Sequence, residues 1–194
     1  KMKYDVMIIG SGPGGYVAAV RAAQLGFNTA VVERENLGGI CLNWGCIPTK
    51  ALLKSAQAFN YIKHSETYGV KIEGSFKPDM NAIVERSRTV AANMGKGVAH
   101  LMQKNNITVI EGEARLTKDR KVSVEMKDGS GTQVFEADHI ILATGARSRN
   151  LPNMPQDGKK IIGYREAMTL REQPESMVVV GSGAIGSEFA HFYQ

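Results

Sequence analysis

The stretch YDVMIIGSGPGG, residues 4–15, joins a short apolar run to the pattern Gly-x-Gly-x-x-Gly. The apolar run predicts a buried strand over 4–9, and the residues after it predict a helix over 14–25. A second apolar run predicts another strand over 29–33, which completes a β-α-β unit. A glycine-rich turn inside such a unit is typical of a fold that binds dinucleotides.

Each glycine of this turn has a physical task in the predicted fold. Gly10 permits the tight strand-to-helix turn, Gly12 lets the backbone approach a pyrophosphate, and Gly15 permits close packing of helix on strand. The free N–H groups and the positive dipole end of the helix then face the phosphates. Glu33 ends the second strand 23 positions after Gly10, where a carboxylate can accept hydrogen bonds from ribose hydroxyls. This acid makes the pattern more specific than the glycines alone.

The segment GGICLNWGCIPTK, residues 38–50, contains both cysteines of the chain. Cys41 and Cys46 are five positions apart, and a regular α-helix would place their Cα atoms roughly 8–9 Å apart. A disulfide usually requires a separation below ~7 Å, so a bond between them needs a distorted helix start, for which Gly45 supplies the freedom. A helix N-terminus also favours a thiolate. We therefore predict a reversible, redox-active disulfide.

Two other interpretations of the cysteines stay open. A metal site needs more ligands, and the nearest histidine, His64, has no second cysteine pair beside it. Alternatively, the cysteines are two buried thiols without a chemical role. Two cysteines in such a chain do not form a secreted disulfide framework, and in a reducing compartment a cysteine pair is more often catalytic or metal-binding than structural.

The rest of the chain predicts an α/β fold with two long helices and an antiparallel meander. The expected elements are helices over 48–68 and 80–104, strands over 107–111 and 139–143, and a meander over 114–116, 121–126 and 133–136. The stretch 148–160 contains several turn residues and marks the expected boundary between two domains.

A second glycine pattern, Gly181-Ser-Gly183-Ala-Ile-Gly186, follows an apolar run over 177–180 that predicts another strand. The chain ends at Gln194, and a complete β-α-β unit needs about 30 residues or more. We therefore expect only the start of a second dinucleotide-binding domain. The strand that would carry the residue separating NAD from NADP is missing.

Composition excludes several classes of protein. The 194 residues are 43% hydrophobic and can bury a core, and the net charge of +5 is spread among basic and acidic residues. This pattern does not favour a nucleic-acid partner. No apolar run approaches the ~18 residues of a membrane-spanning helix, and the chain enters a strand without a signal segment. We expect a cytoplasmic protein that does not bind a membrane.

Together these motifs resemble the pyridine nucleotide–disulfide oxidoreductases. The glycine turn, the dithiol segment, Glu111-Gly112-Glu113-Ala114, Ala143-Thr144-Gly145 and the second glycine pattern carry the resemblance. The short sequences Cys-Leu-Asn and Cys-Ile-Pro-Thr-Lys are most similar to those of the dihydrolipoamide dehydrogenases of the family. The resemblance implies a Rossmann-like FAD-binding domain over 1–150 with a parallel sheet, crossover helices and an antiparallel meander. The start of a Rossmann-like NAD-binding domain follows over 151–194.

The resemblance also implies a set of site residues. Cys41 is similar to the thiol that exchanges with dihydrolipoamide, and Cys46 to the thiol that faces the flavin. The residues implied for FAD are Gly10, Gly12, Pro13, Gly14, Gly15, Glu33, Arg34, Gly38, Gly39, Cys41, Cys46, Lys50, Gly112, Ala114, Ala143, Thr144, Gly145 and Ala146. Those implied for NAD are Gly181, Gly183, Ala184, Ile185, Gly186 and Glu188.

The implied activity is oxidation of protein-bound dihydrolipoamide through the disulfide and FAD, with hydride passed to NAD. The implied partner is the lipoyl domain of a 2-oxo acid dehydrogenase complex or of a glycine cleavage carrier protein, and the full-length protein is expected to be a homodimer. The family's histidine–glutamate base pair lies outside this sequence, so we expect a fragment that does not turn over alone. Two alternatives are a reductase of glutathione disulfide or mercuric ion, and a flavin-binding module without catalysis.

Overall fold

The computed structural model of the chain describes residues 3–194. These residues form two compact units. The first unit contains the described residues up to Asn43 together with Ala92–Arg147, and the second contains Trp44–Ala91 together with Ser148–Gln194. Each unit is thus built from two separated stretches of chain. The division into domains at residue 150 stays a prediction.

Strands and helices alternate at the start of the chain, as the glycine turn predicted. The strands are β1 (Lys3–Ile9), β2 (Thr29–Glu33), β3 (Thr108–Leu116), β4 (Val122–Met126) and β5 (Thr132–Leu142). The helices are α1 (Pro13–Gln24), α2 (Gly39–Trp44), α3 (Cys46–Lys63), the short 3₁₀ helix η1 (Ser65–Tyr68), α4 (Met80–Lys104), α5 (Tyr164–Ala167) and α6 (Ala184–Tyr193).

The five strands close into a ring because each strand pairs with two neighbours. Along β3 and β5 the two neighbours pair with successive parts of the strand. The first part of β3 runs parallel to β2, and from Gly112 the strand runs antiparallel to β4. In the same way β5 pairs antiparallel with β4 as far as Phe135 and then parallel with β1 from Glu136. The sequence predicted a break within each of these strands, and that was wrong. Both strands continue because the backbone hydrogen bonds pass directly from one neighbour to the next.

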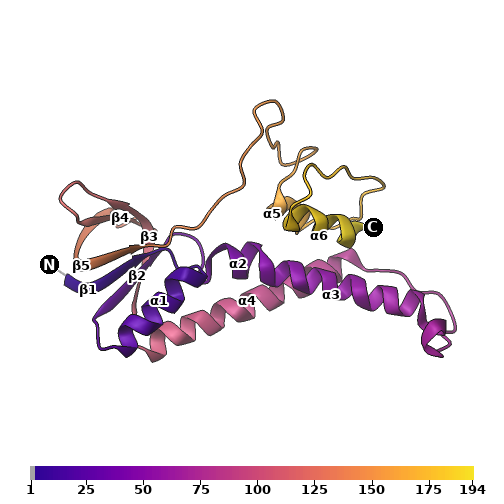
Figure 1. Cartoon of the computed structure of the whole chain (residues 1–194), viewed down its shortest axis with the longest axis horizontal. Helices are drawn as coiled ribbons and strands as arrows, with labels where there is room; N and C mark the ends of the chain where they lie inside the picture. The colour runs from indigo at the N-terminus through magenta and orange to yellow at the C-terminus, as the bar shows by residue number, and fades with distance from the viewer. Residues whose placement is uncertain (1–2) are drawn as a thin grey trace. The chain divides into compact units, whose positions relative to one another are not determined.

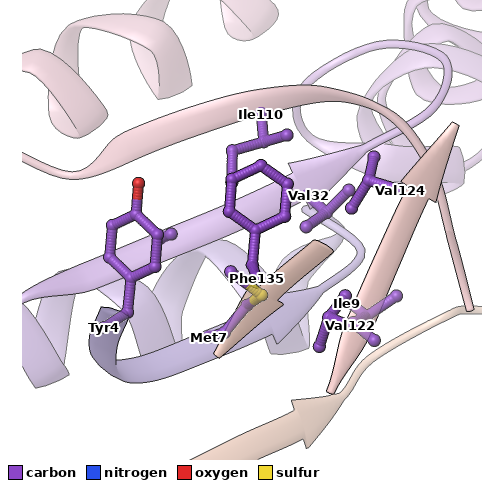
Figure 2. Close-up of a cluster of buried hydrophobic side chains, with 9 residues drawn as sticks. Tyr4, Met7, Ile9, Val32, Ile110, Val122, Val124 and Phe135 are labelled. Atoms are coloured by element: carbon purple, nitrogen blue, oxygen red, sulfur yellow. The ribbon is translucent and has the colours of Figure 1, made fainter. Parts of the chain in front are cut away.

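The core of the first unit draws apolar side chains from all five strands, and Figure 2 shows them directed toward one another. Met7 on β1 and both Val122 and Val124 on β4 have no exposed surface. The ring of Tyr4 lies 6.4 Å from the ring of Phe135, tilted by 44°. Burial of this apolar surface holds the meander against the parallel strands.

Helix α1 packs beside the parallel strands (Figure 1). It begins at Pro13, a residue that is favoured at the first helical position because it needs no N–H partner there. Its buried residues, Gly15 and Ala19, are small, so the helix axis lies close to β1 and β2. The chain leaves the helix through Gly26, which has a positive φ of 91°.

The second unit is helical. Its apolar core, here called the helical cluster, joins α3, the first part of α4, α5 and α6, with Met168 directly after α5. Figure 1 shows α3 beside the first part of α4, where Arg86 donates to the carbonyl oxygen of Ala51 at 2.7 Å. The residues of the helical cluster are Leu52, Val84, Ala167, Met168, Phe189 and Tyr193.

Two local predictions in the second unit differ from the structure. The helix expected over 48–68 ends at Lys63 and is followed by η1. The strand expected over 177–180 does not form: the segment has no regular secondary structure, and Val178 is 90% exposed. A strand is stabilised by the ladder of an adjacent strand, and no described strand pairs with these residues.

The predicted fold class is confirmed: a parallel sheet with helical crossovers and an antiparallel meander is followed by the start of a second glycine-turn unit. Of the helices within residues 3–194, none combines the length and the apolar content that crossing a bilayer requires.

The hydroxyl of Tyr193 gives the helical cluster a pH dependence. Its O–H donates to the carbonyl oxygen of Ala167, and burial raises the pKa of Tyr193 to about 12. Because the pKa of Tyr193 is higher in the folded state than in the unfolded state, the neutral hydroxyl favours the folded protein. The contribution is therefore complete below pH 10 and is lost as the pH rises from about 10 to 12.

We predict that replacing Tyr193 by Phe removes part of the alkaline instability. The free energy of unfolding of the unchanged protein should fall by about 1–2 kcal/mol more than that of the variant between pH 10 and 12, after allowance for solvent screening. Urea unfolding at pH 8, 10, 11 and 12 measures the difference. Parallel pH curves for the two proteins would contradict the prediction.

Candidate functional site

The first glycine turn is closed by contacts between backbone atoms. Gly10 has a φ of +98°, and a Cβ atom there would lie 2.9 Å from the carbonyl carbon of Ala143 and closer still to its oxygen. A Cβ atom on Gly15 would collide with the carbonyl group of Gly10, with the carbon at 2.9 Å. The structure therefore brings Gly10, Gly15 and Ala143 together, as the predicted roles of the two glycines require.

The two glycines that begin the dithiol segment approach the same turn. Gly38 and Gly39 have positive φ values of 94° and 62°, and a Cβ atom on Gly39 would lie 2.6 Å from the Cα atom of Gly12. The amide of Asn43 donates to the carbonyl oxygens of Leu37, at 3.0 Å, and Gly39, at 2.9 Å. Helix α2 thus holds the glycine loop against the first turn.

Ser11 connects three parts of this site and was missed in the sequence. It is completely buried; its backbone N–H and its hydroxyl donate to Oε2 of Glu33 at 3.0 and 2.5 Å. Its carbonyl and hydroxyl oxygens accept from the N–H of Gly38 at 3.1 and 3.2 Å. Only its position between two glycines could have indicated this role, because the partners are 22 and 27 positions away.

Hydrogen bonds hold the carboxylate of Glu33 in place and leave part of its capacity to accept hydrogen bonds unused. Besides Ser11, the N–H of Glu35 donates to Oε1 of Glu33 at 2.8 Å. A carboxylate offers about four lone-pair positions, so room remains for one more donor such as a ribose hydroxyl. The side chain is half-buried at the end of β2. The geometry fits the role that the sequence predicted for it.

A pyrophosphate fits the first turn. The residue that caps α1 is Gly12, and no side chain caps the helix. Gly12 and Gly39 approach closely, because a Cβ atom on Gly39 would lie 2.6 Å from the Cα atom of Gly12. The positive end of the 12-residue helix α1 lies at Gly12. These residues match the donor set of a dinucleotide site.

The other residues predicted for FAD lie around the ends of the parallel strands. Pro13 and Gly14 are exposed at the start of α1, and Arg34 is exposed directly after β2. Thr144, Gly145 and Ala146 are exposed in the segment after β5, and the Cα atom of Thr144 would lie 3.3 Å from a Cβ atom on Gly10. Their contacts with a cofactor stay predictions.

Gly112 has a structural reason that the sequence did not reveal. A Cβ atom there would lie 2.6 Å from Cγ1 of Val124 and 3.1 Å from the carbonyl carbon of Glu125. Gly112 is the residue at which β3 exchanges β2 for β4. The glycine thus permits the closure of the ring, with half-buried Ala114 two positions further on β3. The contacts of Gly112 and Ala114 with FAD stay predictions.

The dithiol segment consists of two helices separated by one residue. Cys41 lies half-buried in α2, and Cys46 is the exposed first residue of α3. Between them Gly45 has φ −144° and ψ −121°. These angles interrupt the helix, as a disulfide between the two cysteines would require. One boundary between the two compact units falls in the sequence between Asn43 and Trp44. The disulfide between the cysteines stays a prediction.

Lys50 and Glu188 were predicted for two different cofactors, and the structure joins them. The ammonium group of Lys50 on α3 forms a salt bridge with Oε1 of Glu188 on α6. Lys50 is 59% exposed and Glu188 is 30% exposed. The pair links the dithiol helix to the helix that follows the second glycine turn.

The second glycine turn repeats the geometry of the first. Gly181 has a φ of +108°, beside +98° at Gly10. Gly183 caps α6 with φ −71° and ψ 169°, as Gly12 caps α1 with φ −63° and ψ −178°. A Cβ atom on Gly186 would lie 3.0 Å from the carbonyl oxygen of Gly181. The turn therefore forms even though the strand before it does not.

The remaining residues of this second turn, Ala184 and Ile185, are exposed in the first turn of α6. Their nicotinamide role stays a prediction. In the part of the chain that the structure describes, no group of three or more His, Cys, Asp or Glu residues could hold a metal ion.

Comparison with known proteins gives a consistent result. A family model described as "Pyridine nucleotide-disulphide oxidoreductase" matches residues 4–194. A "Dihydrolipoyl dehydrogenase" of Rhizobium etli is 53% identical over 98% of this chain and 42% of its own length. One of Chlorobaculum tepidum is 52% identical over 98% of this chain and 40% of its own length.

A solved structure also resembles the chain. The crystal structure of LpdA from Mycobacterium tuberculosis matches with a TM-score of 0.88 and 28% identity, over 100% of this chain and 42% of that protein. The chain thus spans about two fifths of the length of the curated relatives named above.

Two neighbouring glycines allow a matched test of the first turn. Gly15→Ala should lower the free energy of unfolding by about 1–3 kcal/mol, because the new methyl group collides with the backbone of Gly10. Gly14→Ala should be neutral or slightly stabilising, since nothing lies within 4 Å of the position of its Cβ atom. Urea unfolding followed by circular dichroism measures both, and equal effects would contradict the geometry.

Proposed function

The chain belongs to the pyridine nucleotide-disulphide oxidoreductase family, and on this premise we propose that the full-length protein is a dihydrolipoamide dehydrogenase that uses FAD and NAD. The observation that carries the proposal is the dithiol segment: Cys46 is exposed as the first residue of α3, next to the glycine that interrupts the helix. The names of the relatives from Rhizobium etli and Chlorobaculum tepidum support the choice of substrate.

Residues of the first unit hold the flavin nucleotide in this proposal. The backbone of Gly10, Gly12 and Gly15 and the start of α1 bind the pyrophosphate, because this turn carries no side chains on its glycines and α1 offers N–H donors and a positive dipole end. Glu33 accepts a ribose hydroxyl in the orientation that Ser11 imposes. FAD, when bound, supplies the two-electron carrier between the dithiol and NAD.

The cysteines perform the exchange with the substrate. One thiolate of dihydrolipoamide attacks the sulfur of Cys41, the Cys41–Cys46 bond breaks, and Cys46 leaves as a thiolate. The second thiol of the substrate then attacks the mixed disulfide, which releases oxidised lipoamide and leaves Cys41 reduced. Two electrons and two protons have moved from the substrate to the cysteine pair. Re-formation of the disulfide releases these electrons, and bound FAD would supply the carrier that takes them to NAD.

Position within α3 supports the role of Cys46. A thiolate at the first turn of an α-helix is stabilised by the positive dipole end, which favours Cys46 as the leaving group. The salt bridge between Lys50 and Glu188 holds the same end of α3 to α6. We propose that the second glycine turn binds NAD, because its dihedral angles repeat those of the first turn.

The proposed partner is a protein that carries a lipoyl group, namely the acyltransferase of a 2-oxo acid dehydrogenase complex or a glycine cleavage carrier protein. We further propose a homodimer in the cytoplasm, where a reducing environment suits a pair of cycling thiols. The second candidate function keeps the dithiol and changes the substrate to glutathione disulfide. Both candidate functions use the same thiol–disulfide exchange, so assays with the two substrates are needed to distinguish them.

The proposed substrate is tested by steady-state kinetics of the full-length protein. One assay measures oxidation of dihydrolipoamide by NAD, and the other measures reduction of glutathione disulfide by NADH or NADPH. The kcat/KM for dihydrolipoamide should be at least about a hundredfold higher than that for glutathione disulfide. Purified protein should be yellow, with an absorbance spectrum that quantifies the bound flavin. Preference for glutathione disulfide would replace the proposal by the second candidate.

Cysteine replacement tests the mechanism. Cys41→Ser and Cys46→Ser should each lower lipoamide turnover by about a hundredfold or more, because no exchangeable disulfide remains. Both variants should retain flavin and still oxidise NADH with a small artificial electron acceptor that does not need the dithiol. Retained lipoamide turnover in both variants would show that the dithiol does not carry the reaction.

A further inference from the structure

Trp44, the last residue of α2, contacts two positive charges. The guanidinium carbon of Arg88 on α4 lies 4.6 Å from the centroid of the indole ring, and that of Arg165 on α5 lies 5.0 Å away. Both distances are within the ~6 Å of a cation–π interaction, and Trp is the aromatic residue that binds cations best. A half-buried indole with two such partners is held by more than apolar packing.

The two arginines are themselves anchored in the second unit. Nη2 of Arg88 lies 3.3 Å from the sulfur of Met168, a fully buried member of the helical cluster. Burial lowers the pKa of Arg88, and the guanidinium remains charged because its pKa is so high. Arg165 donates to the hydroxyl of Tyr164 at 3.4 Å and lies 6.0 Å from the Tyr164 ring.

The position of Trp44 matters because of the residue that follows it. Gly45 has non-helical dihedral angles, and glycine by itself favours no single conformation. Its carbonyl oxygen accepts the first hydrogen bond of α3, from the N–H of Thr49 at 3.1 Å. Where α3 begins therefore depends on what fixes the backbone beside Gly45. Trp44 directly precedes Gly45, and its side chain packs against the helical cluster.

We propose that Trp44 is a positioning residue for the dithiol: its stacking with Arg88 and Arg165 fixes the helix interruption at Gly45 and so holds Cys46 in place for disulfide closure. The inference deepens the proposed function and assumes that Cys41 and Cys46 form a disulfide. Without the stack, Gly45 can adopt helical angles, and a regular helix places the two Cα atoms too far apart for a bond.

The equilibrium with glutathione measures this positioning directly. Cys41 and Cys46 lose two electrons and two protons and form one S–S bond, while glutathione disulfide gains them and becomes two thiols. The constant of this reaction increases with the fraction of molecules in which the two sulfurs can meet. A cation–π contact changes an equilibrium constant by a factor of about 2 to 30.

The test uses the full-length protein in glutathione buffers of known ratio, with alkylation of free thiols and mass spectrometry of the peptide that contains both cysteines. We expect the constant to fall about threefold in Arg88→Met and in Arg165→Met, and about tenfold in Trp44→Leu. Trp44→Phe and Arg88→Lys keep an aromatic face or a cation and should restore part of the loss. Constants within a factor of two of the unchanged protein in all three loss variants would overturn the proposal.

Arg171→Met is the matched control. Arg171 lies in the same unit and forms a salt bridge of 2.6 Å with Glu85, so its replacement removes one positive charge without touching Trp44. It should leave the constant unchanged, and a fall equal to that of Arg88→Met would overturn the role of the stack. Thermal unfolding of the dithiol form separates the two effects, because loss of packing alone lowers stability without changing the disulfide constant.

The outcomes also separate this inference from the proposed function. If the unchanged protein forms no Cys41–Cys46 disulfide at any glutathione ratio, the proposed function and the positioning role both fail. If the unchanged protein forms it and every variant forms it equally well, only the positioning role fails.

Discussion

Contact between backbone atoms at the first glycine turn is the constraint on which the first unit depends. Gly15 lies against the carbonyl group of Gly10, and Gly10 lies against Ala143 at the end of β5. No side chain fits at either position, so helix α1, strand β1 and strand β5 converge at one point. The pyrophosphate site that we propose lies at the same turn, at the positive end of α1.

Buried hydrogen bonds extend this constraint to the neighbouring segments. Ser11 joins the turn to Glu33 at the end of β2 and to the loop at Gly38. Asn43 then joins that loop to α2, the helix that carries Cys41. In the second unit the salt bridge between Lys50 and Glu188 performs a comparable task between α3 and α6. Polar side chains therefore fix each glycine-rich segment to its neighbours.

Particular elements show where prediction from sequence succeeded and failed. Strands β1 and β2 and helix α4 were located well, because apolar periodicity and glycine stops are local signals. Predicted breaks in β3 and β5 were wrong, since a strand that exchanges partners needs no local break. The strand expected at 177–180 was also wrong: local β-propensity is insufficient when no described strand pairs with it. Ser11 was missed because its partners are distant in the sequence.

The amino-acid sequence by itself determined the two glycine turns, the spacing of the cysteines and the acid at the end of β2. These features follow from what each residue type can do alone: glycine adopts positive φ, cysteine exchanges electrons, and glutamate accepts hydrogen bonds. Only the tertiary structure decided that Gly112 serves ring closure, that Lys50 pairs with Glu188, and that two arginines hold Trp44. Each of these depends on residues that are far apart in the chain and become neighbours through burial of apolar surface.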